Sequence, residues 1–258
     1  MHRLLFASVF LVLSVRVASA QEAIANKLPI VSGPVKTIRL ESFDLKKVDG
    51  KWIEGEKRWR TDTSYNPEKS RIEVALYMGG QNIFRKEVYS FDPQGKLTNW
   101  DLYEADGRHT GTKATYIYVK GGRMSEAIHH LLGSFSYKET FYYPDERHVE
   151  ATTQFHFNEK PDKEVYTYDD KGNIVEAIFY EEDGRLRVKE SYKYDGKGNP
   201  VEFAAHSPTG ALLYKETHRY EFDARGNWIK RTTSEYDPDK GRLQVEPAQV
   251  AKRTISYY

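Results

Sequence analysis

The feature that most constrains the fold of this chain is a repeat of about 26 residues. Most units carry two aromatic residues separated by one residue, followed in the clear copies by Asp and, three residues later, Gly. Aligned on the second aromatic residue, the units are spaced by 26, 27, 25, 25, 26 and 28 residues. The aligned residues are Tyr65, Phe91, Tyr118, Tyr143, Tyr168, Tyr194 and Phe222. A fixed period of this length indicates one supersecondary unit repeated along the chain.

Each unit has the pattern of a β-hairpin. In the unit that starts at Ile174, an apolar run to Tyr180 is followed by a turn at Asp183-Gly184 and by an alternating strand that ends at Tyr194. Asp side chains bond the backbone two residues on, and Gly accepts a positive φ angle, so both suit tight turns. The chain is therefore expected to run as a series of antiparallel hairpins.

One segment tests this register. Residues 123–132 (RMSEAIHHLL) place Met124, Ile128 and Leu131 at helical spacing, which taken alone favours a short helix. In the repeat frame the same segment aligns with the strand that starts at Ile174. We therefore predict a strand here.

Seven or eight hairpins correspond to about 14 to 17 strands, and open sheets rarely exceed ~10 strands without curling, splitting or closing. We predict one all-β domain over residues 36–258, an antiparallel hairpin-repeat sheet that is long and curled or spiral. Its period of two places Leu186, Val188, Glu190, Tyr192 and Tyr194 on one face, which forms an aromatic core. The sequence does not determine whether the sheet closes into a barrel.

The first 20 residues have the pattern of an export signal. Basic residues open the segment, an apolar stretch follows, and Ala18-Ser19-Ala20 matches the small-x-small pattern of a cleavage site. An uncleaved anchor is disfavoured because the stretch is shorter than the ~20 residues that a spanning helix needs. Residues 21–35 are predicted to form a flexible leader. The mature chain then has no transmembrane segment and is expected in the periplasm or outside the cell.

Two copies of Tyr-x-Tyr-Asp-x-x-Gly-Asn, at 166–173 and 192–199, and the connection Asp183-Gly184-Arg185-Leu186 carry a family resemblance. The chain resembles the YD-repeat (RHS-repeat) proteins of bacteria. The resemblance implies hairpins that wind into a spiral sheet or shell. The chain lacks the toxin domain that such shells often enclose, so it implies here a small secreted hairpin-repeat protein.

A glutamate recurs two residues before the aromatic pair and shares its face. The candidate ligand-binding residues are Glu164, Tyr166, Tyr168, Glu190, Tyr192 and Tyr194. Rings that stack and carboxylates that bond hydroxyls would suit a glycan or an extended peptide. The alternative is a structural contact repeated in every unit, which repetition favours because catalysis needs only one perturbed pair.

Other candidate chemistry has a simpler explanation. The acidic run Glu181-Glu182-Asp183 offers the carboxylates of a glycoside hydrolase, but it lies on a turn. His129 and His130 point to opposite faces of a strand and do not share an ion easily. The segment 237–241 hints at a calcium loop, but Ala248 stands where the acidic ligand belongs. We therefore expect no catalytic residue, no metal and no cofactor.

Composition and residue pattern argue against several further classes of protein. The 39 Lys and Arg residues nearly balance the 38 Asp and Glu residues, so a nucleic-acid partner has no support. The absence of Cys excludes disulfides and a thiol nucleophile. A transmembrane barrel needs an apolar lipid-facing row across ~25 Å, but Arg187, Lys189 and Lys193 lie in one row and Glu190 in the other.

These observations predict an exported, non-catalytic β-repeat protein that acts as a binding or structural module of the bacterial envelope or exterior. Its partner is unknown from sequence, with a glycan or a cell-envelope protein as the expected class. The alternatives are a carbohydrate-binding protein that uses the aromatic strand face and, less favoured, a glycoside hydrolase-like enzyme.

Overall fold

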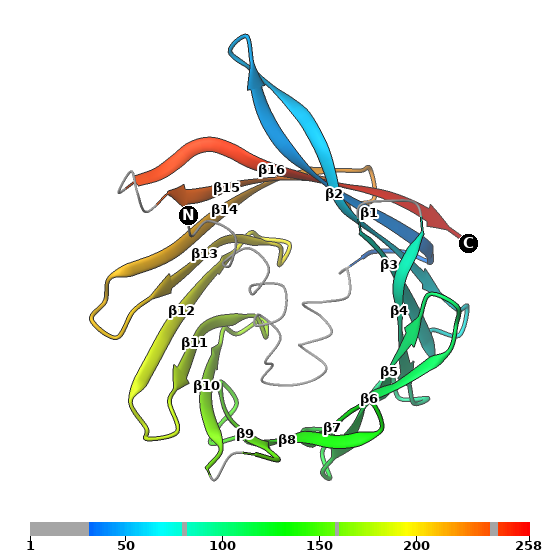
Figure 1. Cartoon of the computed structure of the whole chain (residues 1–258), viewed down its shortest axis with the longest axis vertical. Helices are drawn as coiled ribbons and strands as arrows, with labels where there is room; N and C mark the ends of the chain where they lie inside the picture. Colours follow the sequence, from blue (N-terminus) through cyan, green and yellow to red (C-terminus); the bar gives the residue numbers. More distant parts are fainter. Residues whose placement is uncertain (1–30, 79–81, 158–159, 238–241) are drawn as a thin grey trace.

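The computed structural model describes residues 31–78, 82–157, 160–237 and 242–258. Over these residues the chain forms 16 strands and runs back and forth as a meander (Figure 1). The strands are β1 (Val35–Val48), β2 (Lys51–Tyr65), β3 (Arg71–Met78), β4 (Ile83–Phe91), β5 (Leu97–Glu104), β6 (His109–Tyr118), β7 (Met124–Leu131), β8 (Ser134–Tyr142), β9 (His148–Phe155), β10 (Asp162–Tyr168), β11 (Ile174–Tyr180), β12 (Leu186–Tyr194), β13 (Pro200–His206), β14 (Leu212–Phe222), β15 (Trp228–Asp237) and β16 (Arg242–Tyr257).

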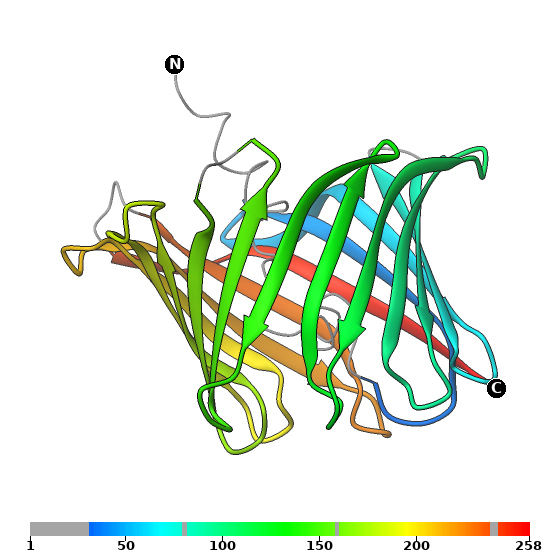
Figure 2. The same cartoon turned by 90° about the horizontal axis from the view of Figure 1, so that it is seen from below.

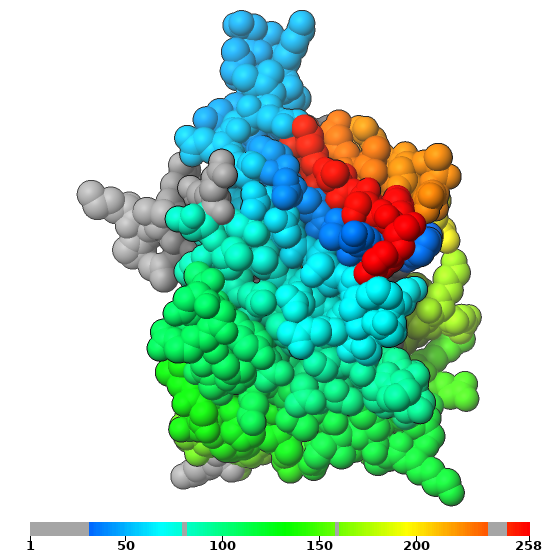
Figure 3. All heavy atoms as spheres, turned by 90° about the vertical axis from the view of Figure 1, so that its right-hand side faces the viewer, coloured from blue at the N-terminus to red at the C-terminus, as the bar shows by residue number. Residues whose placement is uncertain are grey.

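The sheet closes on itself. Every strand pairs antiparallel with its chain neighbours, and β1 pairs with β16 to complete a barrel whose strands are strongly tilted (Figure 2). At the seam, Thr37 lies opposite Ser256 and Leu40 opposite Arg253. On the outer surface the first strand (blue) and the last strand (red) lie side by side (Figure 3). Closure leaves neither terminal strand with a free edge, which removes the usual site of strand aggregation.

The two faces of the barrel wall differ in chemistry. Residues that pair across strands share a face, so the register Tyr166–Ala177–Glu190–Ala205 traces one face across four strands. This face carries most of the aromatic and small apolar residues and is the more buried, as expected for the concave side. Its buried core includes Tyr89, Leu97, Ala127, Ala151, Tyr166 and Ala177.

The outer face is covered by charged residues that pair between neighbouring strands. Lys189 Nζ lies 2.6 Å from Glu176 Oε2. Glu202 accepts from Lys193 and Lys215, both at 2.8 Å. Further cross-strand pairs on the same face are Lys86–Glu73, Lys138–Glu126, Lys163–Glu150 and Arg39–Asp62. Exposed pairs of this kind contribute about 0–1 kcal/mol each, so their main effect is a hydrophilic exterior.

The recurrent Asp and Gly build one type of turn. Asp195 Oδ1 accepts from the backbone N–H of Lys197 at 2.8 Å and of Asn199 at 2.9 Å. Gly198 has a φ of 82°, a value that L side chains rarely adopt. Asp169, with Asn173, makes the same contacts one unit earlier. The motif is thus a local solution to reversing the chain.

The number of strands sets the width of the barrel. Sixteen strands about 4.8 Å apart and tilted by about 40° give a circumference of about 100 Å and a radius of about 16 Å. A barrel of about eight strands is already filled by its inward side chains, whereas 16-stranded barrels enclose a wide interior. By this estimate the closed sheet encloses an interior, here called the lumen, and the inner face of the sheet is its wall.

The antiparallel hairpins expected from the sequence are confirmed, and residues 124–131 form strand β7 rather than a helix. The curled or spiral open sheet is wrong, because β1 and β16 pair and close the barrel. The export signal at residues 1–20 and most of the leader lie outside the described residues. The end of the leader contacts the barrel, since Ser32 N–H donates to Asn227 Oδ1 at 2.6 Å.

In the part of the chain that the structure describes, no helix has the length and apolarity to cross a membrane.

Closure can be tested with an engineered disulfide, because the chain has no native cysteine. The hydroxyl oxygens of Thr37 and Ser256 lie 2.5 Å apart on the exposed side of the seam, so their Cα atoms are at a separation that a disulfide can span. The double variant Thr37→Cys/Ser256→Cys should cross-link within one chain under mild oxidation, as measured by mass spectrometry.

The matched control is Thr37→Cys/Ser191→Cys, whose second site lies on β12, far from the seam in strand order. It should stay reduced in dilute solution. Equal cross-linking in the two variants, or none in the first, would contradict a closed barrel.

Candidate functional site

The recurrent glutamates lie on the lumen wall and bond the tyrosine two residues ahead. Tyr89 Oη donates to Glu87 Oε2 at 2.6 Å. Tyr166 donates in the same way to Glu164, and Tyr192 to Glu190. Residues i and i+2 of a strand share a face, so every such pair brings one carboxylate and one ring together. The repeat therefore produces a series of acid–tyrosine pairs around the lumen.

Glu87 has further partners besides Tyr89, and Glu139 has a histidine as its partner instead of a tyrosine. Glu87 also accepts from Trp100 Nε1 at 3.2 Å and forms an ion pair with Arg85 at 3.0 Å. Glu139, on β8, contacts His129 Nε2 at 2.8 Å. In these units the partner of the glutamate is more often a tyrosine hydroxyl of the same strand than a cation.

The six residues chosen from the sequence fall into two groups by burial. Glu164, Tyr166 and Tyr168 on β10 are buried, with exposed fractions of 1%, 2% and 6%. Glu190, Tyr192 and Tyr194 on β12 are half-buried and present more surface to the lumen. Tyr194 also has a structural contact, because its hydroxyl donates to the Ile174 carbonyl oxygen at 2.9 Å.

An aromatic wall continues from β12 across the next two strands. The rings of Tyr192 and Phe203 are 5.2 Å apart, and those of Phe203 and Tyr214 are 5.9 Å apart, both in tilted contact. Tilted and edge-on ring pairs are the favoured aromatic geometry. These three residues, here called the aromatic wall, form a continuous apolar strip on the lumen side of β12–β14.

Beside the aromatic wall, two glutamates face each other across strands. Glu216 on β14 is the cross-strand partner of Glu235 on β15. Tyr214 Oη donates to Glu216 at 3.1 Å, and Gln249 Nε2 donates to Glu235 at 2.9 Å. Burial raises the pKa of both carboxyls; the charge of Glu235 raises that of Glu216 further, and the charge of Asp44 does so for Glu235. The lumen wall here therefore penalises the charged form of each carboxyl.

Basic groups complete this part of the wall. His218 on β14, Arg231 on β15 and Arg253 on β16 all lie on the inner face. Burial, followed by the charge of Arg231, lowers the pKa of His218 to about 3. The same two causes lower the pKa of Arg253 to about 9. Titratable groups with shifted pKa values mark candidate functional sites, so the β12–β16 wall is the candidate site.

Sequence reasoning found only part of this site. Glu190 and Tyr192 follow from the repeat, but the repeat places His218 where the earlier units have glutamate. Glu235, Arg231 and Arg253 belong to no repeated motif. The available signal was alternation on the last strands, which places Arg231, Thr233 and Glu235 on one face.

The other sequence candidates lie elsewhere. Glu181, Glu182 and Asp183 form the turn between β11 and β12, where Asp183 accepts from the Arg185 N–H at 3.0 Å. His129 and His130 lie on opposite faces of β7. Among the described residues, no three His, Asp or Glu side chains gather as metal ligands would. Positions 238–241 of the segment that only hinted at a calcium loop lie outside those residues.

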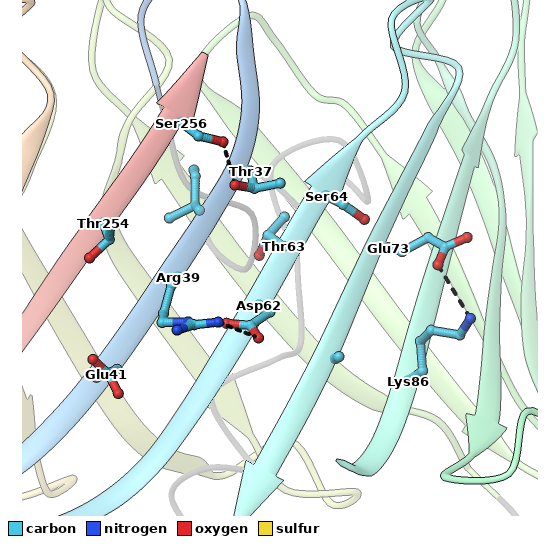
Figure 4. A pocket seen from close by; sticks show the side chains of 12 residues that line it. Thr37, Arg39, Glu41, Asp62, Thr63, Ser64, Glu73, Lys86, Thr254 and Ser256 are labelled. Atoms are coloured by element: carbon cyan, nitrogen blue, oxygen red, sulfur yellow. Dashed lines mark hydrogen bonds and ion pairs between the residues drawn. The ribbon is translucent and has the colours of Figure 1, made fainter. Parts of the chain in front are cut away.

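A groove of about 510 Å³ lies on the outer surface over β16, β1, β2, β3 and β4 (Figure 4). Its charged groups already pair with one another. Arg39 Nε donates to Asp62 at 2.9 Å, and Lys86 Nζ donates to Glu73 at 3.3 Å. Because these groups are satisfied and exposed, the groove offers a ligand fewer free contacts than the lumen wall does.

No protein-family model matches the chain, and a search of curated proteins finds no relative. Solved structures with a similar arrangement include a porin-like protein from Bacteroides uniformis, 12% identical over 88% of this chain and 98% of that chain, with a TM-score of 0.40. A LolA superfamily protein from Nitrosomonas europaea is 9% identical over 93% and 94%, with a TM-score of 0.27. A DUF1329 family protein from Desulfovibrio piger is 9% identical over 86% of both chains, with a TM-score of 0.28.

The expected relation to YD-repeat (RHS-repeat) proteins is wrong. The strands close into a 16-strand barrel instead of winding into a spiral shell. The motif does not identify the family, because Asp, Gly and Asn at these positions stabilise tight turns, which any meander of hairpins needs.

The acidic pair predicts how stability depends on pH. A carboxyl whose pKa is raised by folding contributes stability that is full below its unfolded pKa of about 4.3 and is lost as pH rises through the folded pKa. Glu235→Gln removes the repulsion with Glu216, so it should raise the free energy of unfolding by about 0.5 kcal/mol at pH 7.5, allowing for solvent screening. The gain should shrink near pH 4. Urea denaturation at the two pH values measures it.

The control is Glu221→Gln on the outer face of β14, where Glu221 pairs with Lys230 at 2.7 Å. It should lower or leave unchanged the stability at pH 7.5. A Glu235→Gln variant less stable than the wild type at pH 7.5 would show that the pair is not repulsive.

Proposed function

We propose that the protein is an exported, non-catalytic binding protein of the bacterial envelope, and that it holds an amphipathic, lipid-like molecule in the barrel lumen. The observation that carries the proposal is the combination of a 16-strand lumen with the aromatic wall of Tyr192, Phe203 and Tyr214. Ligand sites are commonly concave and largely apolar, with a few polar groups that fix orientation.

The electrostatics of the wall favour an apolar occupant. Burial raises the pKa of Glu190, Glu216 and Glu235, so it penalises the charged carboxylate at each of these positions. A surface that disfavours charge suits alkyl chains or rings better than a hydrated sugar. The glycan hypothesis therefore becomes the second choice, although Glu190 and Tyr192 would contact either ligand.

The charged outer face of the barrel favours an aqueous environment over a lipid bilayer. The cross-strand pairs Lys189–Glu176 and Lys163–Glu150 lie where a lipid-facing barrel would need an apolar band. Together with the export pattern of residues 1–20, this exterior supports an aqueous compartment of the envelope. Within this proposal the protein lies in the periplasm and not outside the cell, because a carrier of lipid-like molecules acts between two membranes.

The absence of catalysis is also part of the proposal. The acidic pair Glu216 and Glu235 is the best arrangement for a hydrolase, but burial shifts the pKa of both carboxyls upward. Glycoside hydrolysis instead needs environments that separate an acid from an ionised partner. A binding role needs no such division.

Lumen binding can be measured with N-phenyl-1-naphthylamine, a neutral fluorophore that brightens in apolar surroundings. The wild-type chain should enhance its fluorescence. Val188→Trp adds bulk on the lumen side of β12, on the same face as Tyr192 and four residues before it, and should weaken binding about tenfold or more by narrowing the site. Fluorescence titration gives the affinities.

The control is Ser191→Trp, which adds the same side chain to the outer face of β12 and should bind the probe like the wild type. Melting temperatures of both variants separate blocked binding from unfolding. No enhancement by the wild type, or equal binding by a folded Val188→Trp, would contradict the proposal. Retention on a glycan array without probe binding would support the carbohydrate alternative.

A further inference from the structure

Two inward-facing arginines lie at the seam end of the lumen wall. Arg231 on β15 is the cross-strand partner of Tyr220, and Arg253 on β16 is the partner of Leu40. Within the described residues, neither guanidinium forms an ion pair with a carboxylate. By contrast, Arg85, which also faces the lumen, pairs with Glu87 at 3.0 Å. The seam arginines thus depart from the rule that buried charges are paired.

Several hydrogen-bond donors in this cluster have no acceptor. The Nε atom of Arg231, the Nε and Nη1 atoms of Arg253 and the hydroxyl of Tyr65 are buried and lack a hydrogen-bond partner among the described residues. Buried polar groups are satisfied in the large majority of cases, so each exception needs an explanation. Four donors near one another are complementary to a group with several acceptor oxygens.

The arginines are held in place by rings. The Cζ atom of Arg253 lies 3.4 Å from the centroid of Trp228, and that of Arg231 lies 5.8 Å from the same centroid. Tyr220 packs against Trp228 at 5.8 Å, and its hydroxyl donates to the Pro200 carbonyl oxygen at 2.7 Å. Cation–π contact fixes the plane of a guanidinium without using its N–H groups. Arg231 also forms a hydrogen bond with the Tyr220 side chain, whereas Arg231 Nε and Arg253 Nε and Nη1 have no hydrogen-bond partner among the described residues.

Two arginines close together in a desolvated wall lower the stability of the fold unless an anion neutralises them. Burial, together with the charge of Arg231, lowers the pKa of Arg253 to about 9. Two cations in a desolvated wall repel, and replacing buried charges by apolar residues is often neutral or stabilising. Local violations of this kind are expected at functional sites.

We propose that Arg231 and Arg253, with the Tyr65 hydroxyl, bind the oxyanion head group, phosphate or carboxylate, of the molecule held in the lumen. The planar fork of arginine matches both oxyanions. This inference rests on the proposed function for the apolar part of the ligand. The aromatic wall of β12–β14 directly precedes β15 and β16 in the sheet, so a head group at the arginines places the chain along the rings.

The test compares ligands that share one alkyl chain. Calorimetric titration of the full mature chain uses dodecyl phosphate, dodecanoate, dodecanol and inorganic phosphate, with the amphiphiles below micelle formation. The two anionic amphiphiles should bind about tenfold or more tightly than dodecanol. Arg253→Gln and Arg231→Gln should each lose about tenfold for the anions and leave dodecanol unchanged.

Matched controls lie one residue away on the outer face. Lys252→Gln and Lys230→Gln remove the same charge next to Arg253 and Arg231, where the lysines pair with Glu54 and Glu221. They should bind all ligands like the wild type. Equal loss in the lysine variants would indicate a general charge effect and overturn the site.

The outcomes separate this inference from the proposed function. Equal affinity for dodecanol and the two anions would overturn the arginine site and leave lumen binding intact. Arginine-dependent binding of inorganic phosphate, with no contribution from the alkyl chain, would support the anion site with a free anion as its source and overturn the lipid-like ligand. No binding of any of the four would overturn both.

A stability measurement distinguishes binding residues from structural ones. If the arginines serve a ligand, Arg253→Met should leave the melting temperature of the free protein unchanged or higher, because it removes a desolvated, repelled charge. The same variant should lose the rise in melting temperature that dodecyl phosphate gives the wild type. A marked fall in the melting temperature of the free variant would show that Arg253 is structural.

Discussion

The pairing of β1 with β16 is the interaction on which the rest of the structure depends. Antiparallel hairpins can be added to a sheet indefinitely, and only the last pairing converts a strip with two free edges into a barrel with an inside. Closure at 16 strands sets a radius of about 16 Å. It also brings Arg253 on the last strand next to Leu40 on the first.

Closure gives the two faces different tasks. On the convex side, lysines and glutamates reach water and pair across strands, as Lys189 and Glu176 do. On the concave side the side chains converge and space is limited, so each carboxylate needs a hydrogen-bond partner that takes up little additional volume. A tyrosine two residues ahead meets this need in three units, and His129 does so for Glu139. Within the described residues, the wall of β14–β16 breaks the pattern, because Glu216 faces Glu235 and neither Arg231 nor Arg253 has a carboxylate partner. This break, more than the repeat, identifies the candidate site.

The elements that sequence reasoning predicted well are those with local causes. The turn at Asp195 and Gly198 depends on hydrogen bonds within five residues and on one positive φ angle, so the motif is sufficient to identify it. The alternation from Leu186 to Tyr194 likewise identifies the face that turns inward. The family resemblance failed for the same reason, because a local turn motif carries no information on how distant hairpins assemble. Glu235, Arg231 and Arg253 were missed because their significance depends on neighbours in other strands.

The sequence by itself determined an antiparallel hairpin meander, the positions of its turns and the separation of aromatic from charged faces. These follow from backbone preferences and a period of two, which act over a few residues. Only the tertiary structure decided that the sheet closes, how wide the lumen is and which unpaired charges meet at the seam. Those properties arise from a pairing between residues about 200 positions apart, and no short-range pattern specifies such a contact.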